Sequence, residues 1–284
     1  MNQASLTVHR NWRRLSSNSI ALAGVAFVLL IVLAAFVGPV VSPYRQHVGA
    51  FVDFANASQP PSLAHPFGTD LVGRDLMVRV FAGMRLSLFL SIVVLALAIP
   101  PGVTIGLIAG YSRGPLAQVL MRMTDVFLAI PPLVLALAVM GFLPPTLTNA
   151  MIAVAAMWWP WYARITYSLA RSLREEGFVK AAVVVGASRA HILFREILPN
   201  CLPTVLTKAT LDIGFVILIA SSLSFLGLGV QPPTPDLGSM VADGARYLPD
   251  YWWFPLFPGL AVMMTVLGFN LLGDGLRDLL EGAP

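Results

Sequence analysis

Six long stretches of this chain contain no charged side chain, and they limit what the chain can fold into. They cover residues 21–41, 86–112, 126–142, 147–163, 213–230 and 251–273. The hydrocarbon core of a bilayer is about 30 Å thick, so a helix of about 20 apolar residues crosses it. Only 11% of the residues are charged, whereas about a quarter are charged in an ordinary soluble domain. The sequence therefore predicts an all-α membrane protein with about six transmembrane helices.

The first apolar stretch follows three arginines, as the apolar region of a signal peptide does. Its 21 uncharged residues exceed the roughly 7 to 15 residues of that region. We therefore expect an uncleaved first transmembrane helix at 21–41. This assignment divides the chain into a cytoplasmic N-terminal segment (1–20), the first helix, an extracytoplasmic loop (42–85) and a membrane core (86–280).

Lysine and arginine are distributed unevenly between the segments that connect the apolar stretches. If the N-terminus lies in the cytoplasm, the cytoplasmic segments contain 13 of the 18 basic residues, namely Arg10, Arg13, Arg14, Arg113, Arg122, Arg164, Arg171, Arg174, Lys180, Arg189, Arg195, Lys208 and Arg277. The positive-inside rule then predicts a multi-pass protein of the cytoplasmic (inner) membrane with both termini in the cytoplasm. Topology accounts for the net charge of +4, so we expect membrane lipid and no nucleic acid as a partner.

In this orientation the basic segment 175–200 lies in the cytoplasm between the fourth and fifth transmembrane helices. The residues before Gly186 are compatible with a helix that ends there, and Ser188 can cap a second helix. Pro199 disfavours helical geometry at Leu198, so we expect the second helix to end at that point. Small side chains around the turn allow a close approach by another backbone. The segment fits either a docking surface for a cytoplasmic partner or an amphipathic segment on the lipid headgroups.

A motif in this segment resembles a known one. Ala181-Ala182 are followed after three residues by Gly186, and nine residues later by the sequence Glu-Ile-Leu-Pro at 196–199. This pattern resembles the "EAA" loop of binding-protein-dependent ABC importer permeases. Lys180 stands where the motif has Glu, and Glu196 stands where it has Ile. In that family the loop forms a coupling helix that sits in a groove of the ATP-hydrolysing subunit.

Three longer blocks extend the resemblance over nearly the whole chain. They lie at 65–80, 222–244 and 257–280, and they are similar to the second permease subunit of dipeptide, oligopeptide and nickel importers. The resemblance implies a heterodimer with a related permease, two ATP-binding subunits and an extracytoplasmic solute-binding protein. It favours peptides as cargo and leaves nickel or opines open. It also implies an ATPase-coupling site at Lys180, Ala181, Ala182, Gly186, Ala187, Ser188, Ile192, Leu198 and Pro199.

The chain itself does not carry a phosphate-binding loop. Such a loop requires the sequence Gly-Lys-Ser/Thr, and the only two lysines, Lys180 and Lys208, follow Val179 and Thr207. We therefore expect a non-catalytic subunit without a cofactor of its own, with ATP and magnesium bound by the partner ATPases. The four histidines fall on different sides of the membrane in the predicted topology, so no metal site is expected.

Charges near the ends of the apolar stretches test a competing class of protein, the ion-driven secondary transporter. That class is expected to show inverted repeats and unpaired charges at the membrane midplane. The spacing of Asp125 after Arg122, and of Asp212 after Lys208, allows helical ion pairs near the inner surface. With these pairs formed, the sequence favours the importer and keeps the ion-driven transporter as the alternative.

The sequence gives the least information about the passage through which the cargo moves. Ser221, Ser222 and Ser224 give the fifth apolar stretch small side chains. Small residues in a transmembrane helix serve close helix packing, and they can equally line a passage. Both readings stay open for these serines. The pairs Pro100-Pro101 and Pro131-Pro132 predict kinks in the second and third helices.

Overall fold

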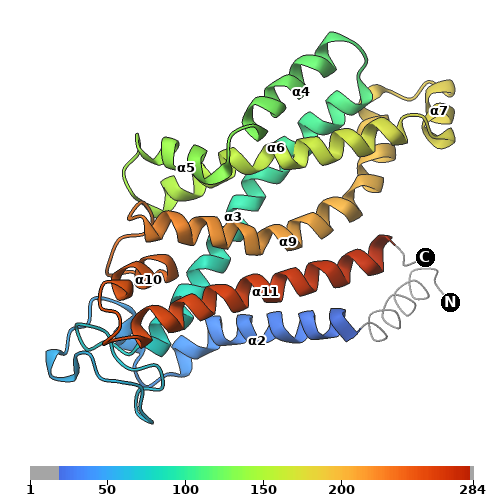
Figure 1. Ribbon diagram of the computed structural model, residues 1–284. Helices are drawn as coiled ribbons and strands as arrows, with labels where there is room; N and C mark the ends of the chain where they lie inside the picture. Colours follow the sequence, from blue (N-terminus) through green and yellow to red (C-terminus); the bar gives the residue numbers. More distant parts are fainter. Residues whose placement is uncertain (1–18, 282–284) are drawn as a thin grey trace.

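The protein is a bundle of long helices in a computed structural model that describes residues 19–281 (Figure 1). Within that range the only β-structure is an isolated bridge between Thr69 and Asp75. The predicted N-terminal segment lies almost wholly outside the described residues, and so do its three arginines. The helices are α2 (Ser19–Val41), η1 (Arg45–Val48), η2 (Phe54–Asn56), α3 (Leu76–Tyr111), α4 (Pro115–Leu128), α5 (Pro132–Met140), α6 (Leu147–Leu173), α7 (Gly177–Val184), α8 (Arg189–His191), η3 (Ile192–Ile197), α9 (Leu198–Phe225), α10 (Leu237–Ala245) and α11 (Trp253–Glu281).

Within residues 19–281, four helical segments are long and apolar enough to cross a membrane: α2, α3, α8 to α9 taken together, and α11. The pair of α4 and α5 passes the same test as one span bent by 84°. The predicted kink at Pro131-Pro132 is confirmed. At Pro100-Pro101, α3 is assigned as one continuous helix, and the kink predicted there stays a prediction. With 27 residues, α6 is about 40 Å long at 1.5 Å per residue. It supplies a sixth helix of spanning length, although its arginines, asparagine and tryptophans make it less apolar.

The closest helix pair is α3 with α6, and glycine makes the contact possible. Gly102, Gly106 and Gly110 lie one turn apart on α3 and all face α6. A Cβ placed on Gly106 would lie 2.5 Å from the carbonyl oxygen of Ala163, and one on Gly102 would meet the backbone of Trp159. Small residues let transmembrane helices pack backbone against backbone, where dispersion contacts replace the missing hydrophobic driving force. The two helices run side by side in the same direction, toward the α7 end of the bundle (Figure 1).

The start of α9 differs from the prediction. The second helix of the cytoplasmic segment does not end at Leu198, whose φ of −55° and ψ of −47° are helical. It continues through the π-helical segment η3 into α9, with Pro199 in the first turn. The wider π-turn changes the backbone pairing just before the proline, so the ring is accommodated without a break. As a result, Lys208 and Asp212 lie within α9 and not in front of it.

Of the two ion pairs predicted from spacing, one is confirmed and the other prediction is wrong. Lys208 Nζ lies 2.9 Å from Asp212 Oδ1, as the spacing predicts. Asp125 pairs with Arg164 at 3.3 Å instead of with Arg122. The reason is that α6 continues through Arg164 and packs against α4, so the arginine lies on a helix beside Asp125 and not in a connecting loop.

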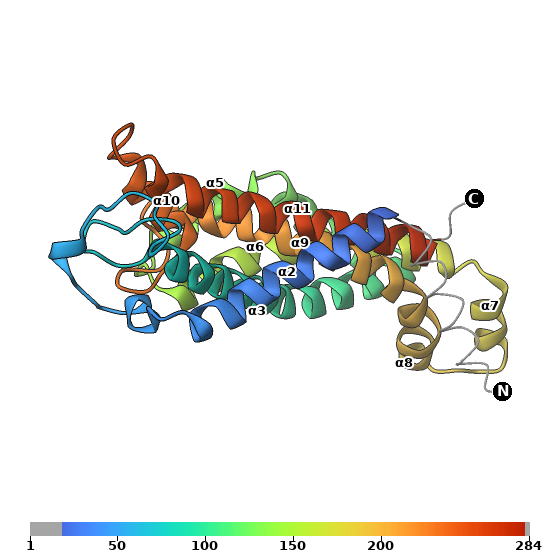
Figure 2. The ribbon, with the colours of Figure 1, turned by 90° about the horizontal axis from the view of Figure 1, so that it is seen from below.

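The predicted outer loop is a folded cap at the α10 end of the bundle, opposite α7 (Figure 2). The buried carboxylate of Asp75 organises it. Its Oδ2 lies 2.8 Å from His65 Nδ1 and its Oδ1 accepts from the Val78 amide, which caps α3. The Asp75 amide donates to Nδ1 of His47, and burial of that ring lowers the pKa of His47. This network makes α3 begin at Leu76, well before the apolar stretch.

We expect the glycine contact between α3 and α6 to be sensitive to a single methyl group. Gly106→Ala should cost about 1–3 kcal/mol, because the new Cβ overlaps backbone that cannot move aside easily. Thermal unfolding of the purified protein in detergent measures the loss as a lower melting temperature. Gly259→Ala on α11 is the matched control, because its Cβ would have a nearest neighbour at 3.9 Å. Equal melting temperatures for the two variants would contradict the assignment.

Candidate functional site: the coupling segment

The segment between α6 and α9 projects from one end of the bundle (Figures 1 and 2). Its first helix, α7, ends at Val184, and Gly186, just beyond the C-cap residue Val185, has a φ of +79°. The Gly186 amide donates to the Val183 carbonyl, and the Ala187 amide donates to the Ala182 carbonyl. This is the C-terminal cap that favours glycine. The Ser188 hydroxyl then accepts from the His191 amide at 3.2 Å, so both predicted caps are confirmed.

The predicted coupling residues divide into two groups. The exposed group consists of Lys180, Ala181, Gly186, Ser188 and Pro199. The others pack inward: Ala182, Ala187 and Leu198 are half-buried against the main core, and Ile192 is 1% exposed. Ile192 therefore holds the segment to the bundle and does not offer a surface to a partner. The exposed group together with its neighbours is the part that another protein can reach.

The prediction missed an apolar patch on this surface, which we call the valine patch, Val183–Val185. The exposures of its three side chains are 52%, 86% and 82%. Contiguous exposed apolar surface on a soluble part of a protein marks an interaction site. The sequence signal was the run of three valines in a segment that otherwise carries charges outside the membrane. The patch lies beside Gly186, so the turn and the apolar surface form one feature.

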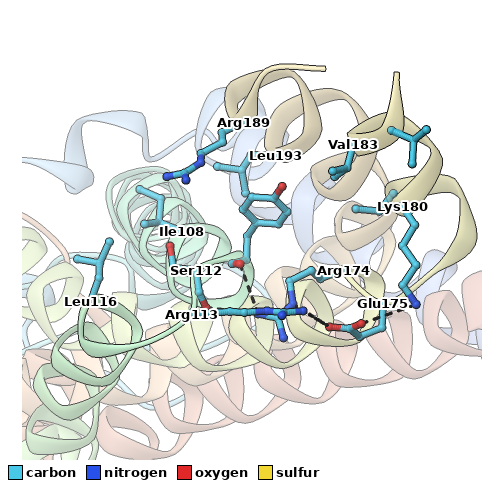
Figure 3. Close-up of a pocket in the computed structure, with 13 residues that line it drawn as sticks. Ile108, Ser112, Arg113, Leu116, Arg174, Glu175, Lys180, Val183, Arg189 and Leu193 are labelled. Atoms are coloured by element: carbon cyan, nitrogen blue, oxygen red, sulfur yellow. Dashed lines mark hydrogen bonds and ion pairs between the residues drawn. The ribbon is translucent and has the colours of Figure 1, made fainter. Parts of the chain in front are cut away.

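A group of charged side chains fastens α7 to the bundle (Figure 3). Arg174, at the end of α6, donates to the carbonyls of Gly110, Tyr111 and Ser112 at 3.3–3.4 Å. These carbonyls end α3 and have no further helical partner, so the arginine caps that helix. The same guanidinium donates through Nε to Glu175 at 3.1 Å. Arg174 thus joins the ends of α3 and α6.

Glu175 extends this connection to α7. Its carboxylate lies 3.1 Å from Arg113 and 3.7 Å from Lys180 on α7. The hydrogen bond from Arg174, together with these charges, lowers the pKa of Glu175. The carboxylate is therefore ionised at neutral pH, accepts hydrogen bonds from Arg113 and Arg174, and forms an ion pair with Lys180. The predicted coupling residue Lys180 is the member of this group that lies on α7.

An open groove of about 830 Å³ separates α7 from the ends of α3 and α4. Its floor is apolar, with Ile108, Leu116 and Leu193, and its rim carries Arg113 and Arg189 (Figure 3). Below it, the buried side chains of the segment belong to the same core as the membrane helices. The coupling segment is therefore packed as one body with the end of the bundle.

The serines proposed for the passage lie at the α10 end of α9. Ser224 is buried, and a Cβ on Gly229 would overlap its side chain. Gly238 of α10 packs directly on the backbone of Ser221, and the half-buried Ser222 donates to the Leu218 carbonyl at 2.8 Å. Close packing accounts for Ser221 and Ser224. A passage-lining role for the three stays a prediction.

Comparison with known proteins shows the family to which this chain belongs. The family model for "binding-protein-dependent transport system inner membrane component" matches residues 102–283, which is more than half of the chain. The chain belongs to this family. It is an inner-membrane permease of a binding-protein-dependent importer, and the model for the "N-terminal TM domain of oligopeptide transport permease C" matches residues 7–61. The resemblance to the second permease subunit is thereby confirmed.

Several curated relatives cover nearly the whole permease. The probable D,D-dipeptide transport system permease protein of Escherichia coli (strain K12) is 41% identical over 95% of this chain and 89% of its own length. The di/tripeptide transport system permease protein of Pseudomonas aeruginosa (strain UCBPP-PA14) is 40% identical over 95% and 90%. The glutathione transport system permease protein of Pectobacterium atrosepticum is 37% identical over 95% and 89%.

A solved structure confirms the fold of the permease. A chain of the MetNI methionine ABC transporter, in an inward-facing form, superposes with a TM-score of 0.57 at 19% identity. The match covers 72% of this chain and 97% of the other. At this identity the likeness concerns the fold alone.

We expect the Ser188 cap to control the local order of the coupling segment. Ser188→Ala removes the acceptor of the His191 amide, and loss of such a cap costs about 1 kcal/mol. Hydrogen exchange of residues 189–197 should therefore become about fivefold faster, since 1.4 kcal/mol corresponds to a factor of ten. Ser172→Ala, at an exposed position of α6, is the control and should leave that exchange unchanged. Unchanged exchange in Ser188→Ala would show that the cap has no energetic role.

Proposed function

We propose that this permease forms half of a passage for peptides, together with a related permease subunit, and couples that passage to two ATPase subunits. A solute-binding protein delivers the cargo to the cap at the α10 end. Peptide cargo is supported by the dipeptide, tripeptide and glutathione systems among the relatives. Nickel and opines remain the alternative cargo. Both termini lie in the cytoplasm in this proposal, which places α7 on the cytoplasmic side.

The observation that carries the coupling role is the rigid attachment of an exposed apolar tip. The valine patch and Gly186 are open to a partner, while Lys180 on the same helix is tied through Glu175 and Arg174 to the ends of α3 and α6. Val179 of α7 is also 1% exposed and belongs to the same core as residues of α3 and α6, so a partner that moves α7 also displaces the membrane helices packed against it. A partner shifts a conformational equilibrium only through contacts that differ between the two states, and an ATPase that closes on ATP supplies such a difference.

In this proposal the partner ATPases carry out ATP hydrolysis. ATP and magnesium bind to the ATPase subunits, and the permease is the non-catalytic part that holds no cofactor of its own. Its contributions are the passage wall, the docking tip and the connection between them. Among the described residues no three His, Cys, Asp or Glu side chains converge on a metal-binding geometry.

The composition of the assembly is the first prediction of this proposal. Affinity purification of the tagged permease from native membranes in mild detergent should recover a related permease and ATPase subunits, identified by mass spectrometry. Solubilised complexes of an unrelated membrane enzyme, purified in parallel, control for the detergent. Recovery of this chain alone, while the control complex stays intact, would favour an ion-driven transporter instead.

The second prediction concerns Gly186. Gly186→Leu should lower uptake of a radiolabelled dipeptide at least tenfold at an unchanged membrane level, because the new side chain stands on the docking tip. Gly227→Leu is a matched control: its φ is +81°, it caps α9 in the same way, and neither glycine has an atom within 4 Å of an added Cβ. Backbone strain of about 1–2 kcal/mol is thus common to both. Equal uptake by the two variants would argue against a docking role for the tip.

A further inference from the structure

An ion pair lies in the middle of α9, within the segment Arg189–Phe225 that is long and apolar enough to cross a membrane. Lys208 Nζ donates to Asp212 Oδ1 at 2.9 Å, and the side chains are 27% and 4% exposed. At 1.5 Å per residue, these positions are about 15 and 21 Å along the helix from Leu198. The sequence placed this pair near the inner surface. Ionisable groups within a membrane-spanning helix face the bundle interior or water, and they usually serve a function.

Two aromatic rings of α6 stand beside the ammonium group. Nζ of Lys208 is 5.7 Å from the ring centroid of Trp161 and 5.8 Å from that of Tyr162. Both distances lie within the range of a cation–π contact. Tyr162 is fully buried, whereas Trp161 is 43% exposed. The lysine is therefore held between a buried ring and a ring that opens onto the surface of this chain.

The pair is incompletely satisfied within the chain. An ammonium group has three N–H donors, and among the described residues Lys208 donates to Asp212 alone. The Tyr162 hydroxyl faces the Asp212 carboxylate and interacts with it, but no hydrogen bond of ordinary length and angle joins that hydroxyl or Asp212 Oδ2 to a described residue. Unmade hydrogen bonds are costly away from bulk water. The remaining donors of Lys208, whose side chain is 27% exposed, are open to water or to an acceptor from outside this chain.

A second charged pair lies on the same side of α6. Arg164 follows Trp161 by about one turn and lies 3.3 Å from Asp125 of α4, with side chains 51% and 44% exposed. Exposed charges on helices of spanning length do not face hydrocarbon. The surface that α4, α6 and α9 form around Asp125, Trp161, Arg164 and Lys208, which we call the charged face, therefore borders water. In the proposed assembly, the passage runs along this face.

We propose that Lys208 and Trp161 form a binding point in the passage for the C-terminal carboxylate of the transported peptide. This proposal rests on the peptide cargo proposed above. Every unmodified peptide carries this carboxylate whatever its side chains are, and a charge-assisted hydrogen bond from an ammonium suits it. The Trp161 ring offers apolar surface to the adjoining residue of the peptide.

Asp212 has a part in the same site. It cancels the charge of Lys208, so the pair is neutral before the peptide arrives and attracts it only through the free donors. A site in a passage must bind well enough to admit the cargo and weakly enough to release it. A lysine without its aspartate would hold a carboxylate more tightly and slow its release.

The test measures uptake of radiolabelled alanyl-alanine by cells that carry the complete importer with variants of this chain. Lys208→Met leaves Asp212 buried and unpaired and is liable to misfold, so the decisive variant is the double one, Lys208→Met with Asp212→Asn. We expect its maximal uptake rate to fall at least tenfold while the KM, set by the binding protein, stays within about twofold. Lys208→Arg keeps the cation and should retain more than a third of the rate.

A variant in which Lys208 and Asp212 exchange places distinguishes a binding role of the pair from a structural role. Lys208→Asp with Asp212→Lys preserves the ion pair but moves the ammonium one turn away from Trp161. We expect this variant to assemble with the ATPase subunits and still to lose at least tenfold in uptake. Wild-type uptake by the exchanged or the neutral pair would overturn the proposal. So would loss of assembly in both, because the pair would then be a structural contact between subunits.

The peptide cargo is tested separately by the unaltered chain. If the wild-type importer assembles with its ATPases but does not take up alanyl-alanine or a tripeptide, the peptide cargo is wrong, and the carboxylate site falls with it. If wild-type uptake is normal and the double variant is normal as well, the cargo assignment stands and only the site is refuted.

Discussion

The close contact between α3 and α6 is the interaction on which the rest of the permease depends. Three glycines remove the side chains that would separate the two backbones, and the helices then run side by side toward the coupling end. Their ends come close enough for Arg174 of α6 to cap the carbonyls of α3. The position of α7 follows from this cap, because Glu175 holds both Arg174 and Lys180.

The sequence predicted the helices well and their ends poorly, for identifiable reasons. Uncharged stretches locate spans because hydrocarbon excludes charge, but a helix extends past its apolar part wherever the protein satisfies the charges. Arg79 in the first turn of α3 illustrates this, since it donates to the carbonyls of His47, Val48 and Pro233 in the cap. These partners come from distant parts of the chain, and no local pattern announces them. Pro199 is a second case, in which the π-turn absorbed a residue that normally ends a helix.

The candidate coupling site was predictable to the extent that it is local. The caps at Gly186 and Ser188 depend on neighbours within five positions, and both formed as expected. The Arg174–Glu175 group joins three helices, and the burial of Ile192 depends on the whole core, so neither could be read from the segment itself. The ion pairs follow the same rule of locality. The spacing predicted the partner of Lys208 correctly because Asp212 lies on the same helix, whereas the partner of Asp125 lies on another helix.

One helix connects the coupling segment with the charged face. The end of α6 carries Arg174, and about 20 Å away, at 1.5 Å per residue, the same helix carries Trp161 beside Lys208. A helix of this length transmits a displacement of its end along its axis, because its backbone hydrogen bonds resist compression. A movement of α7 therefore reaches Trp161 directly, whereas Lys208 is on α9, which joins the coupling segment through the π-turn. Unequal movement of α6 and α9 would change the distance between ring and ammonium, so the site that holds the peptide would open or close with the ATPases.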